Sequence, residues 1–275
     1  MTTEGNMTEW FEGDVIANGV RLHYYRTGGR GGNAKPPLVI VTGVTDIGIG
    51  YSRVARALEG DYDVIMYDAR GHGYSEKLET GYTFEEHAAD LVDLIVALGL
   101  EHPRVIAHSG GAAAAIIAAV DHSDLLAGLI LYEPCWGSGW GGWEMTVIGL
   151  REWFNRMVSL TREELIVEWS ESNPTWTEEE LTYQVESRLQ VSPHVVQTFD
   201  QPEPIWREAL PKIACPILLL TGDRENGLIA PKDVQAMSRL WRDGRVVQIE
   251  GAGHMVHYDC CEPFVEAVQA FLAGI

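Results

Sequence analysis

The chain has 275 residues, of which 46% are hydrophobic and 22% charged, a balance typical of a globular protein and unlike a disordered or fibrous chain. Its 40 acidic and 20 basic side chains give a formal net charge of −20, which repels phosphate backbones and anionic membrane surfaces. We therefore expect one core domain that binds neither nucleic acid nor membrane.

The cysteines and the N-terminal segment indicate in which cellular compartment the protein resides. Cys260 and Cys261 are adjacent, which makes a poor disulfide, and the four cysteines show no metal-binding spacing. The first ten residues lack the basic start and apolar run of a targeting peptide, and no later stretch is long enough to span a membrane. We expect a cytoplasmic protein with reduced thiols, and a homo-oligomer is compatible with the sequence.

The predicted elements begin with a hairpin, because Asn18 and Gly19 separate two alternating apolar runs. After it, short continuous apolar runs alternate with segments of helical period. This alternation predicts an α/β fold with a mostly parallel central sheet and helices on both faces. We expect strands at 37–41, 63–66, 104–107, 128–132, 217–220 and 245–249, and helices at 51–58, 83–98, 110–120, 231–240 and 262–272.

The rhythm breaks over residues 134–210, which are helical in tendency and contain seven of the nine tryptophans. We interpret 134–210 as a helical cap inserted into an α/β core formed by 1–133 and 211–275. Some of its tryptophans are expected to be cap core. Trp136, Trp140 and Trp143, however, lie in the glycine-rich WGSGWGGW, which cannot form a tight helical core. These three are expected to line a pocket for a bulky apolar substrate.

A serine and a histidine carry the predicted chemistry. Ser109 stands where a buried strand runs directly into an alanine-rich helix. The small residues Ala107 and Gly111 permit the sharp turn that exposes a nucleophile, although a serine here is also an ordinary helix N-cap. His254 lies in a glycine-bearing loop after the last strand, from which it can reach the strand ends as general base. His257, closer to the following helix, is expected to be a loop or pocket residue.

Five segments together resemble the α/β-hydrolase superfamily: TGVTDIG, DARGHGYSE, AHSGG, PILLLTGDRE and GAGHMVHYD. The resemblance, with a cap like those of soluble esterases and lactonases, implies a Ser-acid-His triad and no cofactor. The histidines also lack metal-binding spacing, so no metal is expected. The resemblance implies an oxyanion hole made by the backbone N–H groups of Val44 and Gly110. Two positions depart from the pattern, Ala107 in place of glycine and Thr42 in place of histidine.

Three carboxylates are candidates for the acid of the triad. The resemblance places the acid in the loop after the strand that Pro216 opens, which gives Glu225. Asp223 is the close rival, because that loop is longer than usual in the superfamily. Glu133, at the end of the preceding strand, is the third. We rank Glu225 first, then Asp223, then Glu133.

These residues predict a serine hydrolase that cleaves an ester or lactone of a bulky hydrophobic small molecule through an acyl-enzyme. The same triad positions also serve carbon-carbon bond hydrolases and cofactor-free haloperoxidases, which remain alternatives. A ligand-binding receptor with little turnover is another. Ser109 counts against a dehalogenase or epoxide hydrolase of this fold, because those enzymes use a carboxylate nucleophile.

Overall fold

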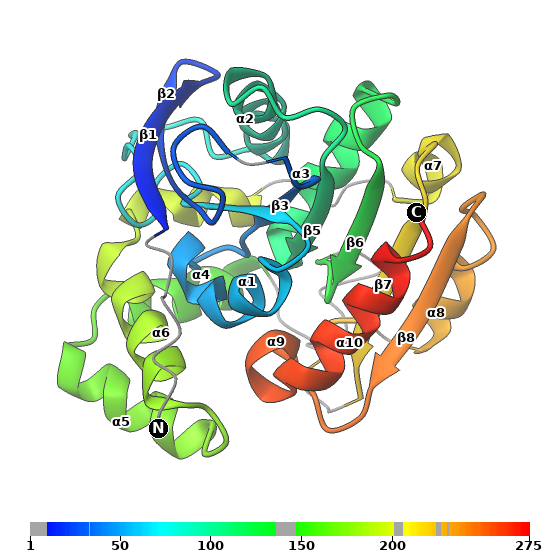
Figure 1. The fold of residues 1–275 in the computed structure, drawn as a ribbon. Helices are drawn as coiled ribbons and strands as arrows, with labels where there is room; N and C mark the ends of the chain where they lie inside the picture. The colour runs from blue at the N-terminus through cyan, green and yellow to red at the C-terminus, as the bar shows by residue number, and fades with distance from the viewer. Residues whose placement is uncertain (1–9, 33, 136–146, 201–205, 224–226, 230) are drawn as a thin grey trace, which may run out of the picture.

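An eight-stranded sheet forms the centre of the molecule (Figure 1). The computed structural model describes residues 10–275 except 33, 136–146, 201–205, 224–226 and 230. The strand order is β1-β2-β4-β3-β5-β6-β7-β8, with β2 antiparallel to both β1 and β4 and every other pair parallel. The strands are β1 (Phe11–Ala17), β2 (Val20–Arg26), β3 (Pro37–Val41), β4 (Asp63–Tyr67), β5 (Arg104–His108), β6 (Gly128–Tyr132), β7 (Ile217–Gly222) and β8 (Gly244–Ile249). The predicted α/β class is confirmed.

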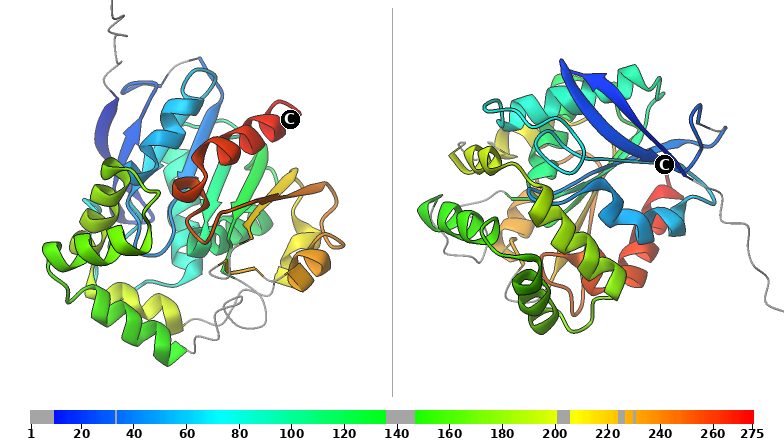
Figure 2. Two further views of the ribbon diagram at one scale, coloured as in Figure 1. Left: turned by 90° about the horizontal axis from the view of Figure 1, so that it is seen from below. Right: turned by 90° about the vertical axis from the view of Figure 1, so that its left-hand side faces the viewer.

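Helices lie on both faces of this sheet (Figure 2). No helix in the described part of the chain has the length and apolar character to cross a membrane. The helices are α1 (Ser52–Leu58), α2 (Phe84–Ala97), α3 (Ser109–Asp121), α4 (Val147–Met157), α5 (Arg162–Ser172), α6 (Glu178–Gln190), α7 (Trp206–Ala209), α8 (Pro231–Met237), α9 (Val256–Asp259) and α10 (Cys261–Leu272). Three 3-10 segments accompany them, at Gly48–Tyr51, Pro193–Asp200 and Leu210–Lys212.

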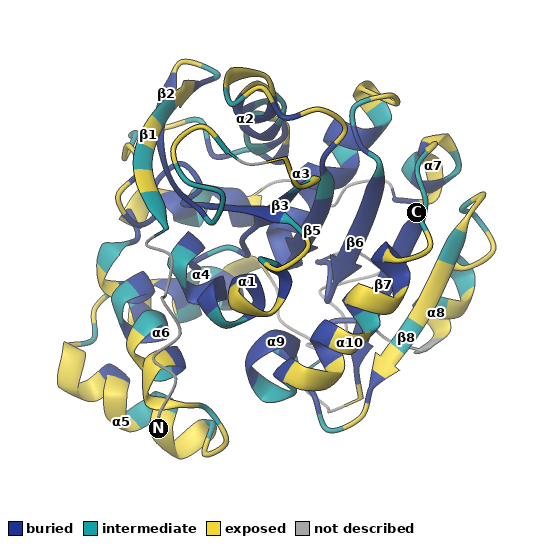
Figure 3. Cartoon of the chain, in the orientation of Figure 1, coloured by how far each residue is buried: buried dark blue, intermediate teal, exposed yellow. Residues whose placement is uncertain are grey.

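The continuous apolar runs arise because the central strands are buried on both sides. In β3, Val39 and Val41 belong to the apolar cluster that α2 and α3 cover, whereas Leu38 and Ile40 belong to the cluster that α1 and α10 cover. Figure 3 shows the central strands in the dark blue of buried residues and the edge strand β8 largely in yellow. Strands of this kind need apolar side chains at every position, which explains their run-like sequence.

The helices α4, α5 and α6 stand between β6 and β7 in the sequence and lie together on one side of the sheet (Figures 1 and 2). Helices α5 and α6 each begin with a capping box, in which a threonine and a glutamate three residues later satisfy free N–H groups. Arg53 of α1 contacts Glu180 of α6 at 2.8 Å, and Arg56 contacts Glu179 at 3.0 Å. These ion pairs join α6 to the sheet-bearing part of the molecule.

Strained backbone gathers where β3, β5 and β6 end. Thr45, Ser109 and Glu133 have positive φ angles of 76°, 49° and 43°, although none of them is glycine. Such conformations cost free energy and persist where the surrounding structure imposes them, often at functional sites. The carboxyl ends of parallel strands meet at one edge of the sheet, which is where α/β folds place their functional sites.

Candidate active site

Ser109 occupies a sharp turn between strand and helix. Strand β5 ends at His108 and α3 begins at Ser109, whose φ of 49° reverses the backbone direction. The turn is possible because Gly111 lies against the end of β3, where a Cβ atom would be 2.3 Å from the carbonyl oxygen of Thr42. Ser109 is 7% exposed and lines a pocket. The first turn of α3 directs its positive dipole end toward this position.

This packing predicts that Gly111→Ala destabilises the protein. The new methyl group has to displace backbone, so we expect a loss of about 1–3 kcal/mol in the free energy of unfolding, as for other overpacked sites. Gly60→Ala is the matched control, because a Cβ at Gly60 meets no atom within 4 Å. Urea unfolding of both variants measures the difference, and equal stabilities would contradict the close packing of the turn.

His254 and Glu133 face each other beside this turn. His254 Nδ1 lies 3.9 Å from Glu133 Oε2, which is within ion-pair range and about 1 Å longer than a hydrogen bond. Glu133 is fully buried, and two backbone N–H groups hold its carboxylate: Gly222 N donates to Oε1 at 2.8 Å and Leu228 N donates to Oε2. The buried carboxylate is therefore fixed in position behind His254.

The other two acid candidates differ from Glu133. Asp223 is exposed, and its Oδ1 accepts a hydrogen bond from Gly251 N at 2.7 Å, which ties the loop after β7 to the loop after β8. Glu225 lies outside the described residues. The structure thus brings the candidate that the sequence ranked third to His254, whereas Asp223 has a structural role between loops.

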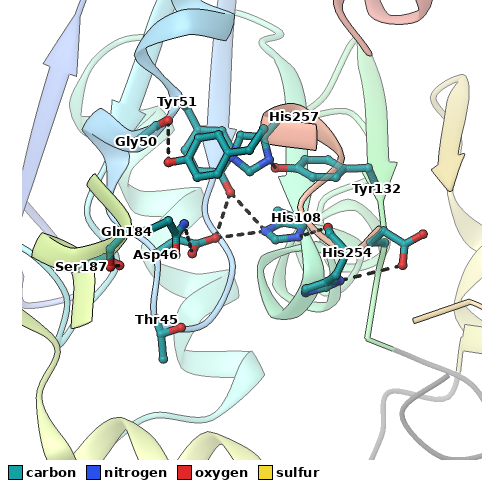
Figure 4. Close-up of polar contacts among 12 residues, drawn as sticks. Thr45, Asp46, Gly50, Tyr51, His108, Tyr132, Gln184, Ser187, His254 and His257 are labelled. Atoms are coloured by element: carbon teal, nitrogen blue, oxygen red, sulfur yellow. Dashed lines mark hydrogen bonds and ion pairs between the residues drawn. The ribbon is translucent and has the colours of Figure 1, made fainter. Parts of the chain in front are cut away.

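A buried polar network lies beside His254 and extends to the loop after β3 (Figure 4). His108 Nε2 lies 3.1 Å from the carbonyl oxygen of His254, and His108 Nδ1 lies 3.0 Å from Asp46 Oδ2. Tyr51 Oη also donates to Asp46 Oδ2, at 3.1 Å. Burial raises the pKa of Asp46, but the hydrogen bond and charge of His108 and the charge of Arg188 outweigh burial and hold that pKa well below its usual range.

His257, expected in the pocket, lies outside it. Its ring stacks on Tyr51 with centroids 4.4 Å apart, and its Nδ1 is 3.1 Å from the hydroxyl of Tyr132. It is only 1% exposed, and burial lowers its pKa well below the ordinary value. The first turn of α9 carries His257 into this aromatic layer, so it supports the site from behind and does not contact the pocket.

The loop after β3 is held by His72. Thr45 N donates to His72 Nε2 at 3.0 Å, and His72 Nδ1 lies 2.8 Å from the carbonyl oxygen of Arg70. Nδ1 therefore carries the only proton, because Nε2 has to accept. Burial lowers the pKa of His72 from its ordinary 6.5 to about 4, although the hydrogen bond to Arg70 opposes the shift.

The depressed pKa of His72 predicts a loss of stability in mild acid. The unfolded chain binds a proton at His72 as the pH falls below 6.5, whereas the folded protein does not until about 4. This contribution is complete above pH 6.5 and is lost at about 1.4 kcal/mol per pH unit as the pH falls toward 4. We expect the free energy of unfolding in urea to fall less between pH 7 and 5 in His72→Gln than in wild type, by about 2 kcal/mol. Parallel losses would show that His72 does not titrate in this way.

The pocket that Ser109 and His254 line has a volume of about 400 Å³. Its wall is largely apolar and comes from the loop after β3 and from α4, α5 and α6. Trp136, Trp140 and Trp143, which the sequence assigned to a pocket, lie outside the described residues. The tryptophans and the aliphatic and methionine side chains among the described lining residues are Trp153, Trp169, Trp176, Val44, Leu150, Met157, Leu228 and Met255.

The predicted oxyanion residues lie together at the turn. Val44 lines the pocket, and a Cβ at Gly110 would be 2.6 Å from Val44 Cγ2, so the start of α3 packs directly against the loop after β3. Gly43 is equally confined, because its Cβ would lie 2.7 Å from His108 Nδ1. Within the described ranges, no three histidine, cysteine, aspartate or glutamate side chains are arranged to hold a metal ion.

Sequence reasoning missed the polar groups of this wall. Asp46 and His108 stand directly within the recognised segments TGVTDIG and AHSGG, so their chain positions alone could have marked them as neighbours of the nucleophile. Arg188 had no such signal, because it lies in α6, whose first turn contains three glutamates. The sequence places Trp153, Trp169 and Trp176 in the tryptophan-rich segment 134–210 but does not indicate that these three line the pocket.

Comparisons with known proteins agree with the observed fold. A model of the alpha/beta hydrolase family matches residues 38–267. The chain is 30% identical over 269 residues to N-formylmaleamate deformylase of Pseudomonas putida, covering 94% of this chain and 96% of that protein. A crystal structure of an N-formylmaleamic acid deformylase from the same species has a TM-score of 0.79 at 28% identity, covering 94% of this chain and all of that one. The structure of E-2-(acetamidomethylene)succinate hydrolase has a TM-score of 0.80 at 21% identity, covering 96% and 100%, and shows the shared fold.

Proposed function

Because this chain belongs to the alpha/beta hydrolase family, we propose that it is a serine hydrolase with Ser109, His254 and Glu133 as its triad. One observation carries the proposal. Ser109, held in a strained turn, lines the same pocket as His254, and the fixed carboxylate of Glu133 lies 3.9 Å behind His254 Nδ1. A nucleophile, a base and an orienting acid in that order are what acyl transfer requires.

The mechanism follows from which nitrogen faces which partner. With Nδ1 turned to Glu133, Nε2 of His254 is left to accept the proton of Ser109 as Oγ bonds to the acyl carbon. The negative charge that develops on the carbonyl oxygen is stabilised by the N–H groups of Val44 and Gly110, each worth roughly 100- to 1000-fold in rate. His254 then protonates the leaving group as its bond to the acyl carbon breaks. Water attacks the acyl-Ser109 ester while His254 takes its proton, and His254 returns that proton to Ser109 Oγ as the acyl-oxygen bond breaks. Glu133 stabilises the imidazolium in both steps.

For the bond cleaved, we propose an acyl carbon-nitrogen bond of a small molecule, as in an N-formyl amide. The support is the full-length relative at 30% identity, whose name is that of a deformylase. In such a reaction the formyl group passes to Ser109, the amide leaves with the proton from His254, and formate is released by water.

Hydrolysis of an ester or lactone is the second candidate. The apolar and aromatic wall formed by Trp153, Trp169 and Met157 favours it, because such a surface suits a hydrophobic group more than a small polar one.

A substrate panel of an N-formyl amide, its formyl ester, a lactone and a carbon-carbon substrate of similar size tests the proposal. We expect kcat/KM to be higher for the N-formyl amide than for the corresponding ester, lactone and carbon-carbon substrate. A preference for the ester or lactone would support the second candidate, and cleavage of only the carbon-carbon substrate would overturn both. A fluorophosphonate probe should label Ser109. Failure of labelling, together with no turnover, would favour a receptor with an inert pocket.

A further inference from the structure

An arginine stands in the wall of the pocket. Arg188, near the end of α6, is 5% exposed and lines the same cavity as Ser109 and His254. It is the only lysine or arginine among the described lining residues. Placing a guanidinium in so buried a position is costly unless its charge and its donors are matched. Its partners therefore show what the position is for.

The hydrogen bonds of Arg188 leave part of its donor set unused. The two hydrogen bonds that Arg188 makes among the described residues both come from Nη1. One goes to the carbonyl oxygen of Thr45 and the other to Ser187 Oγ at 2.9 Å. Nε has no hydrogen-bond partner among the described residues. The guanidinium carbon lies 5.2 Å from the ring centre of Trp169, which also lines the pocket. One edge of the group thus holds the protein, and the rest of it lies against an aromatic wall.

Asp46, the carboxylate that faces Arg188, does not fully match it. Asp46 Oδ1 lies 3.8 Å from Nη1, beyond hydrogen-bond length. Its Oδ2 is already engaged by His108 and Tyr51 at 3.0 and 3.1 Å, so Asp46 divides its charge among several groups.

The two other carboxylates of the pocket wall have partners elsewhere. Glu168 forms a two-pronged pair with Arg156, with one contact at 2.8 Å. Asp259 accepts from Trp176 Nε1 at 2.9 Å and from Gly253 N at 2.7 Å. The positive charge of Arg188 is therefore matched only in part by the protein, in a chain whose net charge is −20.

We propose that Arg188 binds a carboxylate of the substrate, so that the pocket selects small acyl compounds carrying an anionic group. A guanidinium presents a planar fork of N–H donors that matches a carboxylate, and the bond is stronger in a buried site. Arg188 also holds the carbonyl of Thr45, next to Val44 of the predicted oxyanion hole. A carboxylate bound there lies close to the acyl group that Ser109 attacks. The identity of the bound group as substrate rests on the proposed hydrolase function; the anion site itself does not.

A binding measurement tests the anion site without turnover. We expect maleate to bind Ser109→Ala protein in calorimetry and its dimethyl ester to bind weakly. Adding Arg188→Met should weaken maleate binding by about 10- to 100-fold, as for other hydrogen bonds to charged groups, and leave the ester unaffected. Arg53→Met is the matched control, because it removes an ion pair between α1 and α6 away from the pocket. Equal affinity for maleate with and without Arg188 would overturn the proposal.

Kinetics with a matched pair of substrates distinguishes two roles of Arg188: binding the substrate, and holding α6 against the loop after β3. Arg188→Met should lower kcat/KM about 10- to 100-fold for an N-formyl substrate with a free carboxylate and little for its methyl ester. Equal losses on both substrates would mean that Arg188 only supports the loop and would overturn the proposal. Arg188→Lys keeps the positive charge but lacks the planar fork of donors, so its kcat/KM for the substrate with a free carboxylate should lie between those of wild type and Arg188→Met. If maleate binds through Arg188 but no substrate is turned over, the proposed function fails and the anion site stands.

Discussion

Ser109→Ala is expected to reduce kcat for hydrolysis by at least about 10⁴-fold, because removing the nucleophile of a triad leaves only binding and the oxyanion hole. The fold should be unchanged, since alanine removes one hydroxyl, creates no buried charge, and adopts the same φ of 49° with no greater strain than serine. Steady-state kinetics, with a melting curve for each protein, measures both effects.

Ser123→Ala is the control for Ser109→Ala. Ser123 is exposed, and its hydroxyl donates to Asp124 at 3.1 Å. It lies just beyond the C-terminal end of α3, whereas the strained turn is at the N-terminal end. We expect wild-type activity from this variant. If Ser109→Ala keeps more than a few per cent of the wild-type kcat with an unchanged melting curve, the nucleophile is another residue, and the family relation alone would remain.

The architecture could be predicted from the sequence because its central strands are buried on both faces. Runs such as 37–41 and 128–132 are apolar at every position, and the structure forms strands over those same residues. The edge strand β8 shows the opposite case, since its exposed residues make its sequence less distinctive. Boundaries elsewhere shifted by one to three residues, the largest at the helix expected over 231–240, which ends at Met237. At such ends a turn or cap decides where the element stops and hydrophobic period does not.

Local sequence indicated the proposed nucleophile and base, whereas the position of the proposed acid depends on distant parts of the chain. Ser109 lies at a strand-helix junction that the sequence shows directly. The role of Glu133 depends on backbone N–H groups of Gly222 and Leu228, which are 89 and 95 residues away. Its positive φ is also invisible in the sequence. Spacing from Pro216 therefore favoured Glu225, and only the packed sheet edge brings out Glu133.

The histidines show the same limit. His254 and His257 stand three residues apart in one segment, and their spacing does not reveal that α9 begins between them. That first helical turn leaves His254 on the pocket and carries His257 into the ring layer with Tyr51 and Tyr132. Which histidine lines the pocket is thus decided by a helix start that the sequence pattern does not mark.

Glu133→Gln is expected to lower kcat by about 10⁴-fold, the loss seen when a triad acid becomes an amide. The amide keeps the size of the side chain but presents no charge to the imidazolium, and its NH₂ group can turn toward His254 Nδ1 and favour the wrong tautomer. Glu133 lies 3.9 Å from that nitrogen, so the effect should fall on kcat more than on KM. The amide has one oxygen where the carboxylate has two, so only one of Gly222 N and Leu228 N keeps its acceptor. Urea unfolding of the variant measures the resulting loss of stability separately from the loss of kcat.

The rival carboxylates supply the decisive comparison. Asp223→Asn should keep kcat within a few-fold of wild type, because its carboxylate bonds Gly251 N and can be replaced there by an amide oxygen. Glu225→Gln, which the sequence ranking makes the most damaging of the three, should likewise be nearly wild type if Glu133 is the acid. Measuring kcat for the three single variants with one substrate decides among them. A nearly wild-type Glu133→Gln enzyme beside an inactive Glu225→Gln enzyme would restore the order predicted from the sequence, and His254 would then take its orientation from the loop after β7.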